Sequence, residues 1–150
     1  MPILAVLALA GFCSALSVRL LDPLVPAIAR DMLVEPETTA LLASAFAFPY
    51  ALGQPILGPL GDFLGKARVI NACLLVLALA LALCAVAPNI ETLFAARVLT
   101  GLSSGGIIPL VFAAIGDRVP MEERQATISK ALAAILLGGM AGGLLSGLIG

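Results

Sequence analysis

Five long apolar segments divide the 150-residue chain, and they restrict it to a narrow set of folds. The segments cover residues 3–26, 39–60, 69–87, 92–115 and 130–150. A helix of about 20 apolar residues crosses the roughly 30 Å hydrocarbon core of a bilayer. Lipid offers no partner to an unpaired backbone group, and the segments lack the polar alternation of barrel strands. The sequence therefore predicts an all-α, polytopic membrane bundle of five transmembrane helices.

The composition agrees with a membrane protein and excludes several functions. Hydrophobic residues make up 61% of the chain and charged residues 11%, whereas a soluble domain has about 25% charged residues. The net charge is −1 and there is no basic patch, so nucleic acid is not an expected partner. The chain has no histidine, and Cys13, Cys73 and Cys84 lie inside apolar runs without metal-ligand spacing. We expect no metal and no other cofactor.

Basic residues are distributed unevenly between the apolar segments. Loops 62–68 and 117–129, together with the start of the fifth segment, contain Lys66, Arg68, Arg118, Arg124 and Lys130. The other two loops contain Arg30 alone. Cytoplasmic loops of membrane proteins carry an excess of lysine and arginine. The bias predicts that the N-terminus and these two loops face the cytoplasm, in a cell (inner) membrane.

Three ionisable residues, Arg19, Asp22 and Arg97, lie within or at the edge of the apolar segments. A charge at the bilayer centre costs about 2.5–3.5 kcal/mol on insertion scales, so each needs a partner or a wet cavity. Arg19 and Asp22 share a helix face and can form a structural ion pair. Alternatively, Asp22 changes protonation during a transport cycle. Arg97 either extends to the outer interface, or approaches Asp22 or the backbone loosened by Pro23 and Pro26, and these readings stay open.

The fourth and fifth segments are rich in small residues. Close contact between membrane helices depends on such residues, because they let two backbones approach each other. The candidate packing glycines are Gly101, Gly105, Gly138, Gly142, Gly143 and Gly147.

The stretch GPLGDFLGKARV (58–69) carries the most specific motif in the chain. It resembles the signature between the second and third helices of the major facilitator superfamily. The matching positions, with the basic residue that follows them, are Gly58, Leu60, Asp62, Gly65, Lys66 and Arg68. Phe63 and Ala67 stand where the family usually has basic residues. The resemblance implies a loop that latches the two halves of a transporter on the cytoplasmic side.

Elementary physics suits the motif to that role. Asp62 can cap or face a helix N-terminus, where the positive end of the helix dipole stabilises a carboxylate. Gly65 permits a tight reversal of the chain. Gly58 permits close contact with a helix of the other half.

Two glycine-rich stretches strengthen the resemblance. RVLTGLSSG (97–105) is similar to the family's fourth helix, with Arg97 followed four residues later by glycine. The glycines of the fifth segment resemble a degraded antiporter motif, in which Gly143 replaces the usual proline. LDPLVPAIARDM (21–32) also resembles the end of the first helix. The resemblance extends over nearly the whole chain.

The resemblance implies a secondary active transporter for a small solute or drug, coupled to protons, and not an enzyme. The family fold has twelve helices in two halves, so the chain is expected to be a partial N-terminal half, helices 1–5, that lacks its C-terminal half. Its expected partners are the lipid bilayer, a small-molecule substrate and protons. Candidate cavity residues are Phe46, Tyr50 and Gln54, although core packing is the alternative for phenylalanine. The alternative function is a helix-bundle assembly or interaction module that transports nothing.

Overall fold

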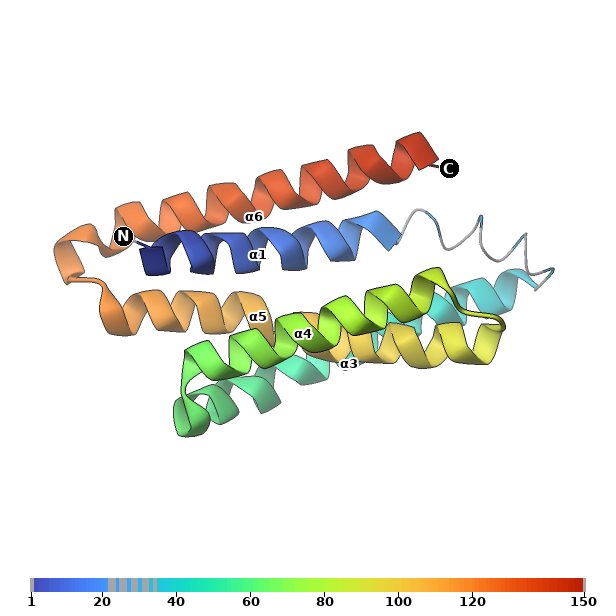
Figure 1. The fold of residues 1–150 in the computed structure, drawn as a ribbon, viewed down its shortest axis with the longest axis horizontal. Coiled ribbons are helices and arrows are strands. Elements are labelled where there is room, and N and C mark those ends of the chain that lie inside the picture. The colour runs from blue at the N-terminus through green and yellow to red at the C-terminus, as the bar shows by residue number, and fades with distance from the viewer. Residues whose placement is uncertain are drawn as a thin grey trace.

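The computed structural model describes residues 2–21 and 35–149, with residues 24, 27, 30 and 33 between them. Its helices are α1 (Pro2–Leu21), α3 (Pro36–Leu64), α4 (Lys66–Ala85), α5 (Ile90–Arg118) and α6 (Met121–Ile149). They alternate in direction, so the N-terminus, the α3–α4 turn and the α5–α6 turn lie at one end of the bundle (Figure 1). The predicted all-α bundle is confirmed for the described part of the chain.

Four of these helices, α3 to α6, are long and apolar enough to cross a membrane. The first helix is shorter, with an apolar core at Leu4–Leu20. Its 20 residues extend about 30 Å at 1.5 Å per residue, which matches the hydrocarbon thickness. Most of residues 22–26, the end of the predicted first span, lie outside the described residues.

Two connections are much shorter than the sequence predicts. Between α3 and α4 only Gly65 is non-helical. Its φ of 94° is a backbone conformation that residues with a side chain rarely adopt. Between α5 and α6 only Val119 and Pro120 are non-helical. Hydropathy detects only the part of a helix that crosses hydrocarbon, whereas these helices continue with polar turns beyond it. The predicted loops 62–68 and 117–129 are therefore mostly helix.

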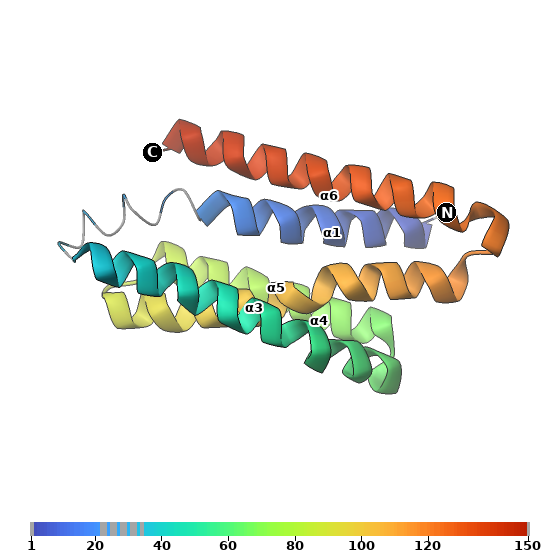
Figure 2. The ribbon, with the colours of Figure 1, turned by 180° about the vertical axis from the view of Figure 1, so that it is seen from behind.

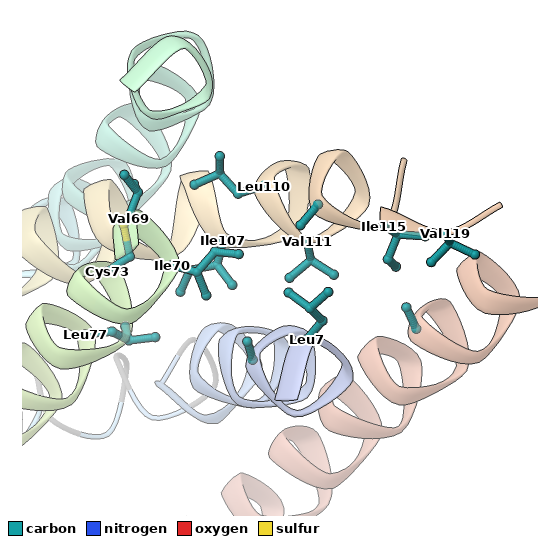
Figure 3. Packing of buried hydrophobic residues seen from close by; sticks show 13 residues of the cluster. Leu7, Val69, Ile70, Cys73, Leu77, Ile107, Leu110, Val111, Ile115 and Val119 are labelled. Atoms are coloured by element: carbon teal, nitrogen blue, oxygen red, sulfur yellow. The ribbon is translucent and has the colours of Figure 1, made fainter. Parts of the chain in front are cut away.

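Helix α5 is the centre of the bundle, because it contacts each of the other four helices (Figure 2). Its Ile107 and Val111 pack between Ile70 of α4 and Leu7 of α1 (Figure 3). Along the two sides, α1 lies against α6 and α3 lies against α5. The bundle is thus built from two long helix pairs, and α4 covers one side of α5.

The buried hydroxyl residues of α5 form hydrogen bonds within their own helix. The hydroxyl of Thr100 donates to the carbonyl of Arg97 at 2.9 Å, and that of Ser104 donates to the carbonyl of Thr100 at 2.6 Å. Ser103 donates to the carbonyl of Leu99 at 2.7 Å. Hydroxyls that bond back to their own helix place no unpaired donor in an apolar environment. This explains how a polar stretch can occupy the middle of the bundle.

Glycines bring the backbones of each long pair together. A Cβ added to Gly101 would overlap the carbonyl oxygen of Phe46, and one added to Gly105 would overlap that of Tyr50. On the other pair, Gly138 and Gly142 of α6 meet the carbonyl oxygens of Phe12 and Leu16 of α1. In both pairs two glycines four residues apart face two carbonyls four residues apart. These four glycines thus lie where two helix backbones approach closely.

The other two candidate packing glycines behave differently. A Cβ added to Gly143 or Gly147 would meet no described atom within 4 Å. Both lie on an exposed part of α6, one and five residues beyond the contact at Gly142. Because successive helical residues are about 100° apart, they point away from α1. No described helix packs against them, so their role in helix packing stays a prediction.

Candidate functional site

Lys66 joins three helices at one end of the bundle. It is the first residue of α4, and its ammonium nitrogen lies 2.6 Å from a carboxylate oxygen of Asp62, in the last turn of α3. The same nitrogen lies 2.6 Å from a carboxylate oxygen of Asp117, near the end of α5. The Lys66 side chain is largely covered, whereas both carboxylates are exposed. The motif lysine therefore ties α3, α4 and α5 together by charge.

The remaining motif positions have distinct surroundings. Gly65 reverses the chain as predicted. It is also the residue that precedes α4, and no side chain caps that helix. Asp62 forms no capping hydrogen bond and binds the ammonium group of Lys66, the first residue of α4, so of the two predicted arrangements it does not cap the helix but lies beside its N-terminus. Gly58 has no described atom within 4 Å of a Cβ position, and its contact with another half of the protein stays a prediction.

Asp117 and Arg124 belong to this junction, and the sequence reasoning did not single them out as site residues. Arg124, at the start of α6, donates to the carbonyl oxygen of Gly116 at 2.6 Å, which closes the last turn of α5. A usable signal existed for Asp117. The charge bias places loops 62–68 and 117–129 on the same side of the membrane, so an acid in one loop is a natural partner for a lysine in the other.

Arg97 lies in the interior of the bundle, with 1% of its surface exposed. Its guanidinium carbon is 4.6 Å from the centre of the Phe46 ring on α3. A cation over an aromatic face is attracted by the ring quadrupole, and more strongly where water is excluded. The interpretation in which Arg97 extends to the membrane interface is therefore wrong. Asp22, its proposed partner, lies outside the described residues.

A cavity of about 460 Å³ opens between α1, α3, α5 and α6. Its lining is mainly apolar, with Arg19 of α1, Tyr50 of α3 and Ile108 of α5 among the residues around it. Arg19 is exposed, and its side chain runs beside Gly139 and Gly142 of α6. These glycines leave room for the arginine where larger residues would fill the space. The cavity thus combines one cation, one phenol and an apolar wall.

The predicted cavity residues on α3 divide into two groups. Tyr50 lines the cavity and stacks on Phe46, with ring centres 5.6 Å apart. Phe46 itself is buried under Arg97, which favours core packing over contact with a substrate. Gln54 is exposed and is not part of the lining. A continuous row therefore connects the cavity to the buried charge through Tyr50, Phe46 and Arg97.

Comparison with known proteins decides the family. The sequence pattern described as "Major Facilitator Superfamily" matches residues 7–150. The chain belongs to the major facilitator superfamily. An MFS-type transporter of Bacillus subtilis, YwfA, whose function is not characterised, is 35% identical over 82% of this chain and 30% of its own length. The niacin transporter NiaP of Acinetobacter baylyi is 30% identical over 81% of this chain and 28% of its own length.

A third relative has a similar relationship to this major facilitator chain. The gentisate transporter of Corynebacterium glutamicum is 30% identical over 75% of this chain and 26% of its own length. The chain spans less than a third of the length of these curated relatives. The five helices correspond to one part of such a protein.

Proposed function

We propose that this chain supplies the first five helices of a proton-coupled secondary transporter for a small solute or drug. The observation that carries the proposal is the cavity between the two long helix pairs, where Arg19 and Tyr50 meet an apolar wall. A cavity of about 460 Å³ has the size of a small-molecule site. Membership of the major facilitator superfamily supports a transport role for such a cavity.

In this proposal Asp22 and the arginines of α1 and α5 have different roles. Asp22 exchanges a proton, and Arg97 sets the proton affinity of Asp22. Burial raises the proton affinity of a carboxylate, whereas a nearby guanidinium lowers it. The guanidinium of Arg97 lies over the Phe46 ring, and this contact supports a role in which a positive charge at a fixed position sets the proton affinity of Asp22. Arg19 binds the substrate in the cavity or, as the rival reading, pairs permanently with Asp22.

The junction at Lys66 serves as the cytoplasmic latch in this proposal. Helices α3 and α5 end there and α4 begins there, and the two ion pairs hold these three termini together. A second half of the transporter would dock near Gly58, where a Cβ would meet open space in the described helices. Movement of that half between inward-open and outward-open states would require the latch to release.

The experiment uses the complete reading frame in proteoliposomes that enclose a pH-sensitive dye. Gentisate and niacin are probes taken from two relatives, and ethidium represents the drug class. The expected result is uptake or efflux of one probe that depends on a proton gradient. Asp22→Asn should abolish the dependence on pH, whereas Arg19→Gln should mainly weaken binding of the probe.

Three outcomes would contradict parts of the proposal. Full pH-dependent transport by Asp22→Asn would exclude the proton role of Asp22. If Asp22→Asn and Arg19→Gln both destabilise the fold and have no other effect, Arg19 and Asp22 form a structural pair, and the proton site lies elsewhere. A complete protein that moves no probe or proton, but purifies in a stable membrane complex, would favour the assembly module instead.

A further inference from the structure

A second hollow lies on the opposite side of α5 from α1, in a groove between α3, α4 and α5. Its volume is about 430 Å³. The groove shares no lining residue with the cavity at Arg19. Nearly all of its wall is apolar, and the residues on which the argument depends are Leu60, Leu64, Arg68, Ala72, Val76 and Leu102. An open groove this apolar in a membrane protein can be filled by hydrocarbon.

Arg68 is the charged residue in the wall of this groove. It lies in the first turn of α4, two residues after Lys66. Two carboxylates neutralise Lys66. The exposed Arg68, in contrast, has no ion pair with any residue that the structure describes. The groove thus has an uncompensated cation at one end.

The register of α4 aligns this cation with the apolar wall. Arg68, Ala72 and Val76 are spaced four residues apart, so they follow one face of the helix. At 1.5 Å per residue, Val76 lies about 12 Å further along the helix than Arg68. The charge is therefore at the end of the groove near the α3–α4 turn, where the polar surface of a bilayer is expected. The apolar wall continues toward the membrane centre.

We infer that this groove binds an anionic phospholipid. One acyl chain lies along the apolar wall, and the phosphate receives hydrogen bonds from the guanidinium of Arg68. A guanidinium binds phosphate with two parallel hydrogen bonds, and it is less strongly hydrated than an ammonium group. The predicted orientation places Arg68 in the cytoplasmic leaflet, where anionic lipids are abundant. This inference concerns a different surface from the transport site and does not depend on the transport proposal.

Native mass spectrometry of the complete protein tests the inference. The protein is extracted from nanodiscs that contain equal parts of phosphatidylglycerol and phosphatidylcholine, and the retained lipids are counted by mass. The wild type should retain phosphatidylglycerol in preference to phosphatidylcholine. Arg68→Gln should reduce this retention about fivefold, which corresponds to about 1 kcal/mol for one basic residue near a lipid headgroup. Arg68→Lys keeps the charge but cannot form the two parallel hydrogen bonds of a guanidinium, so this variant should retain an intermediate amount of phosphatidylglycerol.

Filling the groove provides a second, independent test. Ala72→Phe places a ring against the wall and should displace the acyl chain, even though Arg68 is unchanged. Ala78→Phe, at an exposed site on the same helix outside the groove, is the matched control and should retain the lipid. Arg118→Gln removes an exposed arginine at the same end of the bundle and should also have no effect.

Three results would overturn the inference. The first is equal retention of both lipids together with an unchanged Arg68→Gln variant, which would indicate ordinary surrounding lipid. The second is equal loss in Arg68→Gln and Arg118→Gln, which would indicate a diffuse charge effect. The third is an Ala72→Phe variant that loses thermal stability while its lipid retention is unchanged, because a protein segment would then occupy the groove.

Discussion

Gly105 of α5 lies so close to Tyr50 of α3 that a methyl group on the glycine would overlap the tyrosine's carbonyl oxygen. The contact matters for function because Tyr50 also lines the cavity beside Arg19. The close approach of the two backbones therefore sets the position of the Tyr50 side chain in the cavity. One turn away, Gly101 lies equally close to the backbone of Phe46, whose ring lies under the guanidinium of Arg97.

The first prediction is that Gly105→Ala lowers the stability of the bundle. The added methyl group must push α3 away from α5, and overpacking of this kind costs about 1–3 kcal/mol. Thermal unfolding in detergent measures the effect. Gly143→Ala is the matched control, because the same methyl group there meets open space and improves helix propensity by up to about 1 kcal/mol. Equal stability of the two variants would show that the α3–α5 contact is looser than the structure indicates.

The second prediction concerns the Lys66 junction. Asp62→Asn and Asp117→Asn should each impair transport by the complete protein while leaving its thermal stability nearly unchanged. Both carboxylates are largely exposed, at 69% and 59%, and exposed ion pairs add little stability. A shift in the balance between open and closed states can still change transport about fivefold or more. Proteoliposome transport and thermal unfolding are measured on the same samples.

Glu122→Gln is the control for the junction, because Glu122 is an exposed acid in the first turn of α6. It forms no ion pair with any described residue. Its transport rate should equal that of the wild type. Wild-type transport rates in both aspartate variants would show that the junction is only a structural turn with no role in transport.

The sequence predicted the helices and the motif because both depend on local information. Apolar length identified the spans, and the spacing in 58–69 identified the turn at Gly65. The partner of Lys66 on α5 was missed because Asp117 is 51 residues away, and only packing brings the two together. The same limit applies to glycines: composition marked six on the fourth and fifth segments as candidates, but helix rotation decides that Gly142 faces α1 and Gly143 does not.

The burial of Arg97 shows the limit for charged residues. Near the end of an apolar segment, an arginine can extend to the interface or turn inward, and hydropathy gives both outcomes the same score. In the structure the guanidinium turns inward over Phe46 of another helix, which lies close to α5 at Gly101. A single sequence contains no record of that pairing.

The third prediction is that the N-terminus, the α3–α4 turn and the α5–α6 turn face the cytoplasm. The structure places them at one end of the bundle (Figure 1), and five of the eight basic residues belong to these turns and the helix segments beside them. Cysteine labelling from outside intact cells tests the side, after Cys13, Cys73 and Cys84 are replaced. Glu35→Cys should react and Ala67→Cys should not. Both sites are exposed, and Ala67 is chosen because its replacement leaves Lys66 intact. Labelling at 67 without labelling at 35 would invert the orientation.

The fourth prediction is a measurable coupling between Arg97 and Phe46. Phe46→Leu keeps an apolar side chain but removes the ring face that lies 4.6 Å from the guanidinium carbon. Arg97→Met removes the charge and keeps much of the length. In a double-mutant cycle on thermal unfolding of the complete protein, the double variant should lose less stability than the sum of the single variants. A buried cation over a ring predicts a coupling of about 1–2 kcal/mol.

Phe112→Leu provides the comparison for this cycle. Phe112 is a partly buried phenylalanine on α5, and its position is 15 residues beyond Arg97, or about 22 Å along the helix. Substitutions at that separation should be additive with Arg97→Met within about 0.5 kcal/mol. Additivity in both cycles would mean that Phe46 only fills space beside Arg97. Coupling at Phe46 alone would establish that the ring stabilises the buried charge of Arg97. The proposed role of Arg97 requires such a contact, because the guanidinium must keep one position to set the proton affinity of Asp22.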